Sequence, residues 1–224
     1  MTRRQKGRPA KVVTPHGDVS ITVDGPRSAE ALLLVGPGAG ANMHSDFLSF
    51  MADGLASEGI RVCRFNFVYS ELGRKAPDRQ PILEETYRAV AEHARKGWAG
   101  RVFLGGKSMG GRIASHVVAE GYEVDGLVFF GYPLHPPGRP EKLRDEHLYQ
   151  VKPRMLFIQG SRDPFCPLPT LEGVRKRFPG SSEVAVIEGG DHSFKVRKAS
   201  GRSTSDAWTE VVERAAAWIS DPPD

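Results

Sequence analysis

Three side chains of this sequence could together carry out an acyl transfer: a serine, an aspartate and a histidine. Ser108 stands in the middle of Gly-Lys-Ser-Met-Gly, between an apolar run and a helical periodicity. Asp163 and His192 each follow a later apolar run. A serine at a sharp turn from strand to helix exposes its hydroxyl, an imidazole can remove the hydroxyl proton, and a carboxylate can orient the imidazole. The order Ser, Asp, His therefore predicts a nucleophile, an orienting acid and a base.

The glycines around Ser108 favour the same interpretation. A Cβ on Gly106 or Gly110 would collide with the neighbouring backbone at such a turn. The helix expected next would direct its free N–H groups and positive dipole end at the same place, which suits a reaction that forms an oxyanion. Taken alone, the pattern also fits a glycine-rich turn with a solvent-exposed serine.

The acid and the base each have an alternative. Asp191 could replace Asp163, but neighbouring side chains rarely reach the required geometry, so Asp163 is favoured beside His192. Asp163 could instead be a turn residue before Pro164, and His192 could be a turn residue packed under Phe194.

A pair of backbone donors is expected opposite the nucleophile. The glycine-rich segment 36–40 follows an early apolar run, where a second amide for an oxyanion hole would lie, and the first comes from the residue after the serine. We therefore assign the oxyanion donors to the N–H groups of Ala39 and Met109.

Apolar runs and helical periodicities alternate along the chain, which is typical of a mostly parallel sheet covered by helices. We expect strands at residues 19–23, 31–35, 62–67, 101–104, 126–130, 155–159 and 183–187. We expect helices at residues 46–58, 81–97, 110–120, 169–178 and 204–219. Loops at the carboxyl ends of parallel strands form the ligand crevice, and all three candidate side chains fall on such loops. Segment 133–151 is too short for a large lid, which predicts a minimal cap and an open site for small acyl groups.

Composition narrows the class of protein. The 224 residues carry 31 basic and 27 acidic side chains, and residues 1–11 hold five of the basic ones and no acid. We predict a basic disordered tail at 1–11, a single domain at 12–224, and no nucleic-acid partner. Neither a membrane span nor an apolar signal segment is expected, and two cysteines make no disulfide framework, which predicts a cytoplasmic protein. The histidines lack ligand spacing, so no metal or other cofactor is expected.

Together these residues resemble the α/β-hydrolase superfamily, from about residue 31 to 219. They are similar to its small, nearly lidless members akin to dienelactone hydrolase, and closer still to the branch with the hydrolase-like domain of NSL chromatin complex subunit 3. The sequence segments that carry this resemblance lie at residues 36–40, 64–67, 106–111, 159–165 and 190–194. It implies an eight-stranded, mostly parallel sheet and hydrolysis through an acyl-serine. The chain departs from many relatives at Pro37, where they have histidine.

We therefore expect an α/β fold and a serine hydrolase, monomeric or homodimeric, that cleaves a small ester or thioester. The main alternative is the same fold used as a non-catalytic binding scaffold. A dinucleotide-binding oxidoreductase is a weaker one, because the strand after the segment 36–41 does not end in an acidic residue. A P-loop is disfavoured because Arg101 stands where its first glycine should be. Lys107 and the basic residues of segment 74–79 could favour an anionic substrate, but solvated surface charges are the better explanation.

Overall fold

A computed structural model, described here for residues 9–221, contains one sheet of eight strands in the order β1-β2-β4-β3-β5-β6-β7-β8. The strands are β1 (Ala10–Val12), β2 (Val19–Asp24), β3 (Ala31–Gly36), β4 (Arg61–Phe65), β5 (Arg101–Lys107), β6 (Gly126–Phe130), β7 (Arg154–Gly160) and β8 (Ser182–Ile187). Strands β3 to β8 run parallel to one another, whereas β1 and β2 form an antiparallel edge. Every residue of β3 and β6 is buried, as expected for parallel strands covered on both faces.

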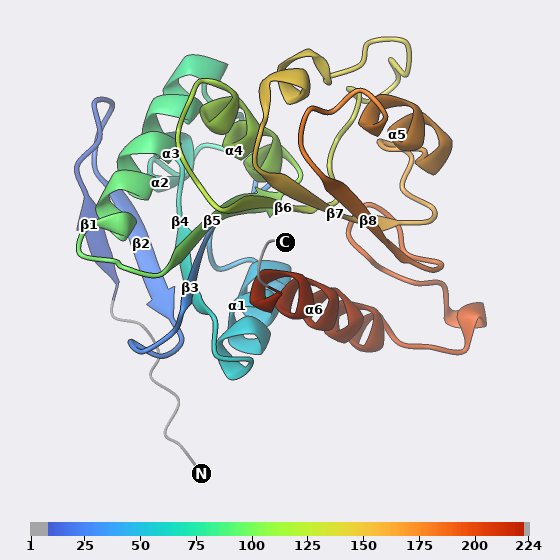
Figure 1. The fold of residues 1–224 in the computed structure, drawn as a ribbon, viewed down its shortest axis with the longest axis horizontal. Helices are drawn as coiled ribbons and strands as arrows, with labels where there is room; N and C mark the ends of the chain where they lie inside the picture. Colours follow the sequence, from blue (N-terminus) through green and yellow to red (C-terminus); the bar gives the residue numbers. More distant parts are fainter. Residues whose placement is uncertain (1–8, 222–224) are drawn as a thin grey trace.

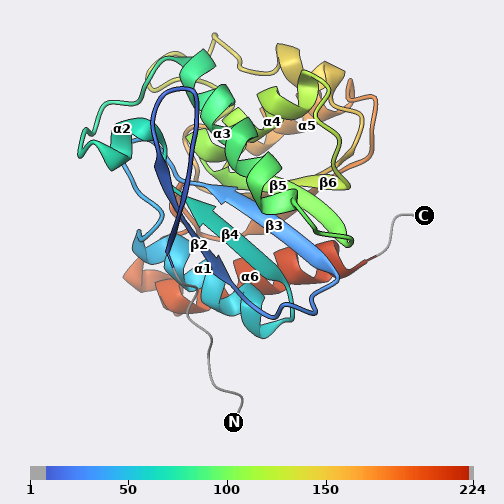
Figure 2. The ribbon, with the colours of Figure 1, turned by 90° about the vertical axis from the view of Figure 1, so that its left-hand side faces the viewer.

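Helices cover both faces of this sheet (Figures 1 and 2). On one face lie α3 (Gln80–Arg95), α4 (Met109–Ala119) and α5 (Leu168–Arg175), and on the other lie α1 (Asp46–Ser57) and α6 (Thr204–Ser220). Short helical segments, α2 (Val68–Glu71), η1 (Glu146–Gln150) and η2 (Lys198–Ser200), stand in the connections. Within residues 9–221, no helix has the length and apolarity needed to cross a bilayer.

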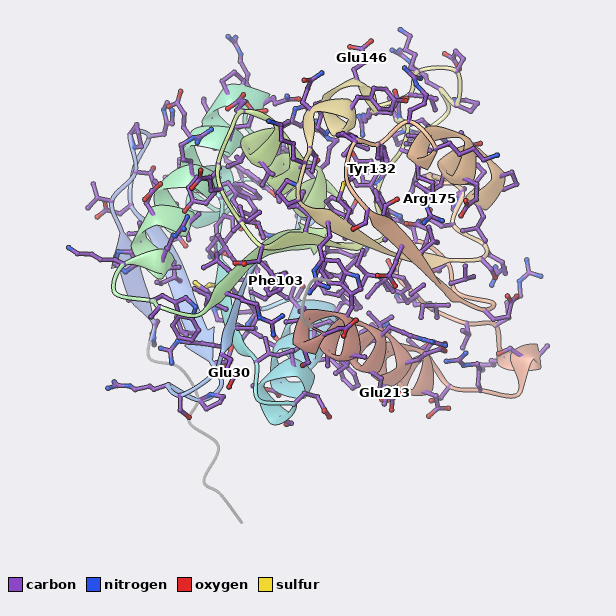
Figure 3. The ribbon with its side chains drawn as sticks, in the orientation of Figure 1. Glu30, Phe103, Tyr132, Glu146, Arg175 and Glu213 are labelled. Atoms are coloured by element: carbon purple, nitrogen blue, oxygen red, sulfur yellow. The ribbon has the colours of Figure 1, made fainter. Side chains whose placement is uncertain are left out.

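The sheet divides the hydrophobic core into two halves. Phe103 of β5 lies in the half shared with α1 and α6, and its ring packs edge-on against Trp218 with ring centroids 5.9 Å apart. Tyr132 lies in the other half and packs edge-on against Phe157, with ring centroids 5.6 Å apart. Figure 3 shows these two labelled side chains on opposite sides of the sheet. Both rings are fully buried, so each helix layer is held to the sheet by apolar contact.

All seven predicted strands and five predicted helices are present, most of them with shifted ends, and the predicted eight-stranded α/β fold with a minimal cap is confirmed. The long connection from β6 to β7 contains only η1 and no lid.

The N-terminal prediction needs a correction. Ala10 and Lys11, expected at the end of a disordered tail, belong to β1, while residues 1–8 of that segment lie outside the described residues. Strand β1 pairs with the edge of β2, with Val12 opposite Val19, and Lys11 Nζ lies 2.7 Å from Glu71 Oε2. A three-residue strand is too short to show a periodicity, so pairing and this ion pair override the appearance of a charged tail.

A buried ion pair fixes the loop before α1. Arg64 of β4 donates from Nη2 and Nε to Asp24 Oδ2, at 2.8 and 3.1 Å, and both side chains are 8% exposed. The remaining guanidinium nitrogen, Nη1, donates to the carbonyl oxygen of Met43 at 2.8 Å and to Ser49 Oγ at 3.1 Å. Removing Asp24 would leave a buried cation without its counter-ion.

Replacing Asp24 with alanine should therefore lower the free energy of unfolding by about 3 to 5 kcal/mol. Urea denaturation followed by circular dichroism measures this loss. Asp53→Ala, at an exposed position of α1, is the control and should change stability by less than about 0.5 kcal/mol. Equal effects of the two substitutions would show that the buried pair does not stabilise the fold.

Candidate active site

The turn from β5 into α4 holds Ser108 in a conformation that few non-glycine residues adopt. Its φ is 51° and its ψ is −114°, and it is the residue that immediately precedes α4. A Cβ on Gly110 would lie 2.1 Å from the carbonyl oxygen of Gly36, and one on Gly106 would lie 2.5 Å from the same oxygen. Only glycine at both positions lets the turn lie against the end of β3, as the sequence predicted. The strained serine is therefore presented at the carboxyl edge of the sheet.

Loops after three different strands bring Ser108, His192 and Asp163 into one hydrogen-bonded line. His192 Nε2 lies 2.8 Å from Ser108 Oγ, and His192 Nδ1 lies 2.7 Å from Asp163 Oδ2. The Asp163 carboxylate is completely buried, whereas the imidazole is 20% exposed. The carboxylate also accepts hydrogen bonds from Gln159 Nε2 and from the backbone N–H of Phe165. These additional donors hold the carboxylate in place behind the imidazole.

The other candidate acid has a different position. Asp191 Oδ1 accepts hydrogen bonds from the backbone N–H groups of Ser193 and Lys195, at 2.7 and 2.9 Å, and so shapes the turn that carries His192. Phe194 anchors this turn, because its buried ring stacks on Phe47 with centroids 5.4 Å apart. Phe194 has a φ of 59°, a value that a bulky residue adopts only when its surroundings impose it. The imidazole is therefore held from both ends of its loop.

Lys107 holds the same loop from the opposite side of the site. Its Nζ donates a 2.5 Å hydrogen bond to the backbone carbonyl oxygen of His192 and lies 5.7 Å from the Phe194 ring centroid. Burial lowers the pKa of Lys107 to about 8, although the nearby charges of Asp163 and Asp191 oppose this shift. Lys107 is thus not the solvated surface charge that the sequence favoured; a contact between residues so far apart in the chain leaves no local pattern.

Burial also sets the protonation of His192. It lowers the pKa of the imidazole below its ordinary value of 6.5; the hydrogen bond that His192 donates to Asp163 opposes the shift, and the ammonium of Lys107 adds to it. At neutral pH the imidazole is therefore unprotonated, and Nε2 can accept the proton of Ser108 when Nδ1 donates to Asp163.

A cavity of about 560 Å³ opens above these groups, and Ala39 and Met109 line it together with Ser108 and His192. Met109 is the first residue of α4, so its N–H has no acceptor within the helix. The loop around Ala39 is held by the buried Tyr69 hydroxyl, which accepts from the Gly40 N–H at 3.2 Å and lies 3.4 Å from the Gly38 carbonyl oxygen.

Sequence reasoning missed several residues in or beside this cavity. His135 lines the cavity and Tyr69 holds the loop around Ala39, and both lie in segments without a recognisable motif. Arg112 and Arg144 also line the cavity, and the position of Arg112, one helical turn after Ser108, could have indicated its place. Arg74 instead forms an ion pair with Asp78, at 2.7 Å. Among residues 9–221, no cluster of three or more histidine, cysteine or acidic side chains is arranged to hold a metal ion.

Comparison with known proteins gives a family and a shared fold. The family described as "Alpha/beta hydrolase domain" matches residues 29–220. An alpha-beta serine hydrolase homologue from Coxiella burnetii is similar over 98% of this chain and 100% of its own, with a TM-score of 0.75 and 18% identity. Dienelactone hydrolase from Anabaena variabilis has a TM-score of 0.73 and 20% identity over 96% of each chain. A serine hydrolase without a lid, from Xanthomonas campestris, has a TM-score of 0.74 and 21% identity over 99% of each chain.

The contact between Lys107 and the His192 loop predicts a change in titration. Lys107→Met removes a positive charge that disfavours imidazolium, so the pKa of His192 should rise. The pKa is measured from the ring-proton chemical shift of His192 in NMR spectra recorded across pH. Lys195→Met, at an exposed position of the same loop, is the control and should leave the titration unchanged. A His192 pKa that stays constant or falls in Lys107→Met would contradict this electrostatic role.

Proposed function

The chain belongs to the α/β hydrolase family, and on that premise we propose that it is a serine hydrolase that cleaves small esters or thioesters. The predicted superfamily and the likeness to dienelactone hydrolase are confirmed, whereas the NSL subunit 3 branch stays a prediction. The observation that carries the proposal is the hydrogen-bonded line from Ser108 through His192 to Asp163.

In the first half of the proposed reaction, Ser108 Oγ attacks the carbonyl carbon of the substrate while His192 Nε2 takes the hydroxyl proton. The buried carboxylate of Asp163 keeps the Nδ1 proton in place and stabilises the imidazolium that forms. Collapse of the tetrahedral intermediate breaks the bond to the alcohol or thiol, which leaves with the proton from His192. Ser108 then carries the acyl group as an ester.

In the second half, water attacks the acyl-serine. His192 accepts a proton from the water and returns it to Ser108 Oγ as the carboxylic acid departs. This cycle needs an imidazole that is neutral at the start of each half, and the lowered pKa of His192 supports that state at neutral pH.

The oxyanion of each tetrahedral intermediate would be bound by the N–H groups of Ala39 and Met109. Both residues line the cavity beside Ser108, and a Cβ on Gly38 would lie only 3.8 Å from the Ser108 Cβ, so the two loops are in contact. Preorganised donors stabilise developing charge because they need no rearrangement during the reaction. Tyr69 supports this arrangement, since its hydroxyl contacts backbone groups on both sides of Ala39.

Small substrates fit the shape of the site. No lid formed by the described residues covers the cavity of about 560 Å³, and the ring of Phe165 packs edge-on against His192 with centroids 4.7 Å apart. The neighbouring folds in the comparison include a dienelactone hydrolase and a serine hydrolase without a lid, which supports a small acyl substrate here.

A fluorophosphonate probe tests the proposed nucleophile and separates the hydrolase from a non-catalytic scaffold. The wild-type protein should be labelled, and Ser108→Ala should lose both the label and at least about 10⁴-fold in kcat for p-nitrophenyl butyrate. Ser57→Ala, whose exposed hydroxyl bonds only the Asp53 carbonyl oxygen among the described residues, is the matched control and should label normally. A folded wild type that neither labels nor hydrolyses the ester would favour the scaffold.

The Tyr69 hydroxyl provides a second test, directed at the oxyanion loop. Tyr69→Phe keeps the ring but frees the loop around Ala39, so kcat should fall about 10-fold or more with little change in KM. Steady-state kinetics on p-nitrophenyl butyrate measure both constants. Tyr122→Phe removes a hydroxyl that has no partner among the described residues and serves as the control. An unchanged kcat in Tyr69→Phe would show that this hydroxyl does not position the loop.

A further inference from the structure

Two arginines line the cavity that holds Ser108, and they come from different parts of the chain. Arg112 lies on α4, one turn after the serine, and Arg144 lies in the connection from β6 to β7. We propose that they form a subsite for an anionic group of the substrate. This group is a carboxylate or a phosphate, and it is separated from the scissile carbonyl. This inference rests on the proposed hydrolase function and names the class of ester that the site selects.

Neither guanidinium is neutralised by a described carboxylate: among residues 9–221, no acidic side chain forms an ion pair with Arg112 or Arg144. Arg112 Nη1 donates to Gln80 Oε1 at 2.9 Å and lies 3.2 Å from His116 Nε2, while its buried Nε has no partner in the part of the chain that is described. Both guanidinium groups line the same cavity, and burial, with a smaller contribution from the charge of Arg144, lowers the pKa of Arg112. An anion bound in that cavity would be attracted by both charges.

Two acidic groups near the arginines, Asp78 and Glu84, are engaged elsewhere. Asp78 also lines the cavity, but its carboxylate accepts hydrogen bonds from the Tyr69 N–H at 2.9 Å and from Arg74 Nη2 at 2.7 Å. Glu84 attracts Arg112 at longer range, yet its carboxylate accepts from Gln80 Nε2, and burial raises its pKa. The cavity wall therefore keeps an excess of positive charge.

His135 adds an unpaired polar atom to the same cavity. The residue is 5% exposed, its Nδ1 lies 2.9 Å from the Pro136 carbonyl oxygen, and its buried Nε2 has no hydrogen-bond partner among the described residues. Buried polar atoms usually have partners, so an unpaired one in a cavity wall points to a ligand group that completes it. The cavity thus offers two cations and a free ring nitrogen beyond the reacting serine.

The two arginines also border a second cavity of about 390 Å³, which is lined by the stacked rings of His116 and His147 and by Asp145 and Glu146. Burial and then Arg112 lower the pKa of His116 to about 4; burial, His116 and Arg112 lower that of His147 to about 3. Both rings are neutral at pH 7, so the arginines supply the positive charge at this boundary. Planar guanidinium groups bind a carboxylate or phosphate with paired hydrogen bonds, which single ammonium groups do not provide.

The experiment compares an anionic ester with a neutral one of matched length. Wild type should hydrolyse p-nitrophenyl hemiglutarate with a kcat/KM at least about 10-fold above that for p-nitrophenyl valerate, mainly through KM. Arg112→Gln and Arg144→Gln should each reduce this ratio about 10-fold, and the double variant should bring it to about one or below. Arg139→Gln removes an exposed arginine from the same connection and should keep the wild-type ratio. A wild-type ratio near one, or a high ratio that survives in the double variant, overturns the subsite.

A binding measurement separates this inference from the proposed function. Calorimetry on Ser108→Ala with monomethyl glutarate should detect binding that weakens at least about 10-fold when Arg112→Gln and Arg144→Gln are added. If no ester is hydrolysed but this binding is seen, the subsite stands and the hydrolase proposal falls; absence of binding overturns the subsite. Glutarate and inorganic phosphate are also tested as inhibitors of valerate hydrolysis or as ligands of Ser108→Ala, to identify which anion the subsite prefers. If neither anion inhibits or binds, the proposed subsite is overturned.

Discussion

The contact between the end of β3 and the turn from β5 into α4 determines the geometry of everything around it. Gly36 and Gly110 approach so closely that a Cβ on the latter would lie 2.1 Å from the carbonyl oxygen of the former. This approach brings the loop after β3 to the start of α4, so Ala39 and Met109 line one cavity with Ser108 between them. A single added methyl group at Gly110 would separate Ser108 from the loop that faces it. The cost of this arrangement is visible in the backbone of Ser108, with its positive φ.

A second close backbone contact aligns Asp163 with His192. Gly160 ends β7, and a Cβ there would lie 2.4 Å from the carbonyl oxygen of Gly190, in the loop after β8. The N–H of Arg162 donates to that same oxygen at 2.9 Å. The loops that carry Asp163 and His192 are therefore joined through backbone groups before their side chains meet. Since backbone positions vary less than side-chain rotamers, this contact sets the distance that the hydrogen bond between the two residues requires.

The parts of this structure that could be predicted are those with a local signal. Ser108 was recognisable because its glycines, strand and helix are adjacent in sequence, and Asp163 and His192 because parallel strands place their following loops at one edge. Strand β1 was not predicted because its three residues are too few to show a period, and its extended structure depends on pairing with β2. The bond from Lys107 to the His192 carbonyl joins residues 85 positions apart and depends on one extended side chain, which no spacing rule captures. The position of Arg144 in the cavity was not predicted for a similar reason, since the connection that contains this residue has no periodic pattern.

The distribution of charge follows from the same arrangement. The neutral imidazole of His192 lies between the buried carboxylate of Asp163 and a cavity wall that carries Lys107, Arg112 and Arg144. Positive charge on that side opposes protonation of the resting imidazole, as the effect of Lys107 on its pKa shows, and it attracts the negative charge of an oxyanion. In the proposed reaction these effects would act together, because the imidazolium formed by proton transfer to His192 and the oxyanion beside it would stabilise each other. The pKa of Lys107, lowered to about 8, means that part of this field disappears as the pH rises through that value, while the two guanidinium groups remain charged at that pH.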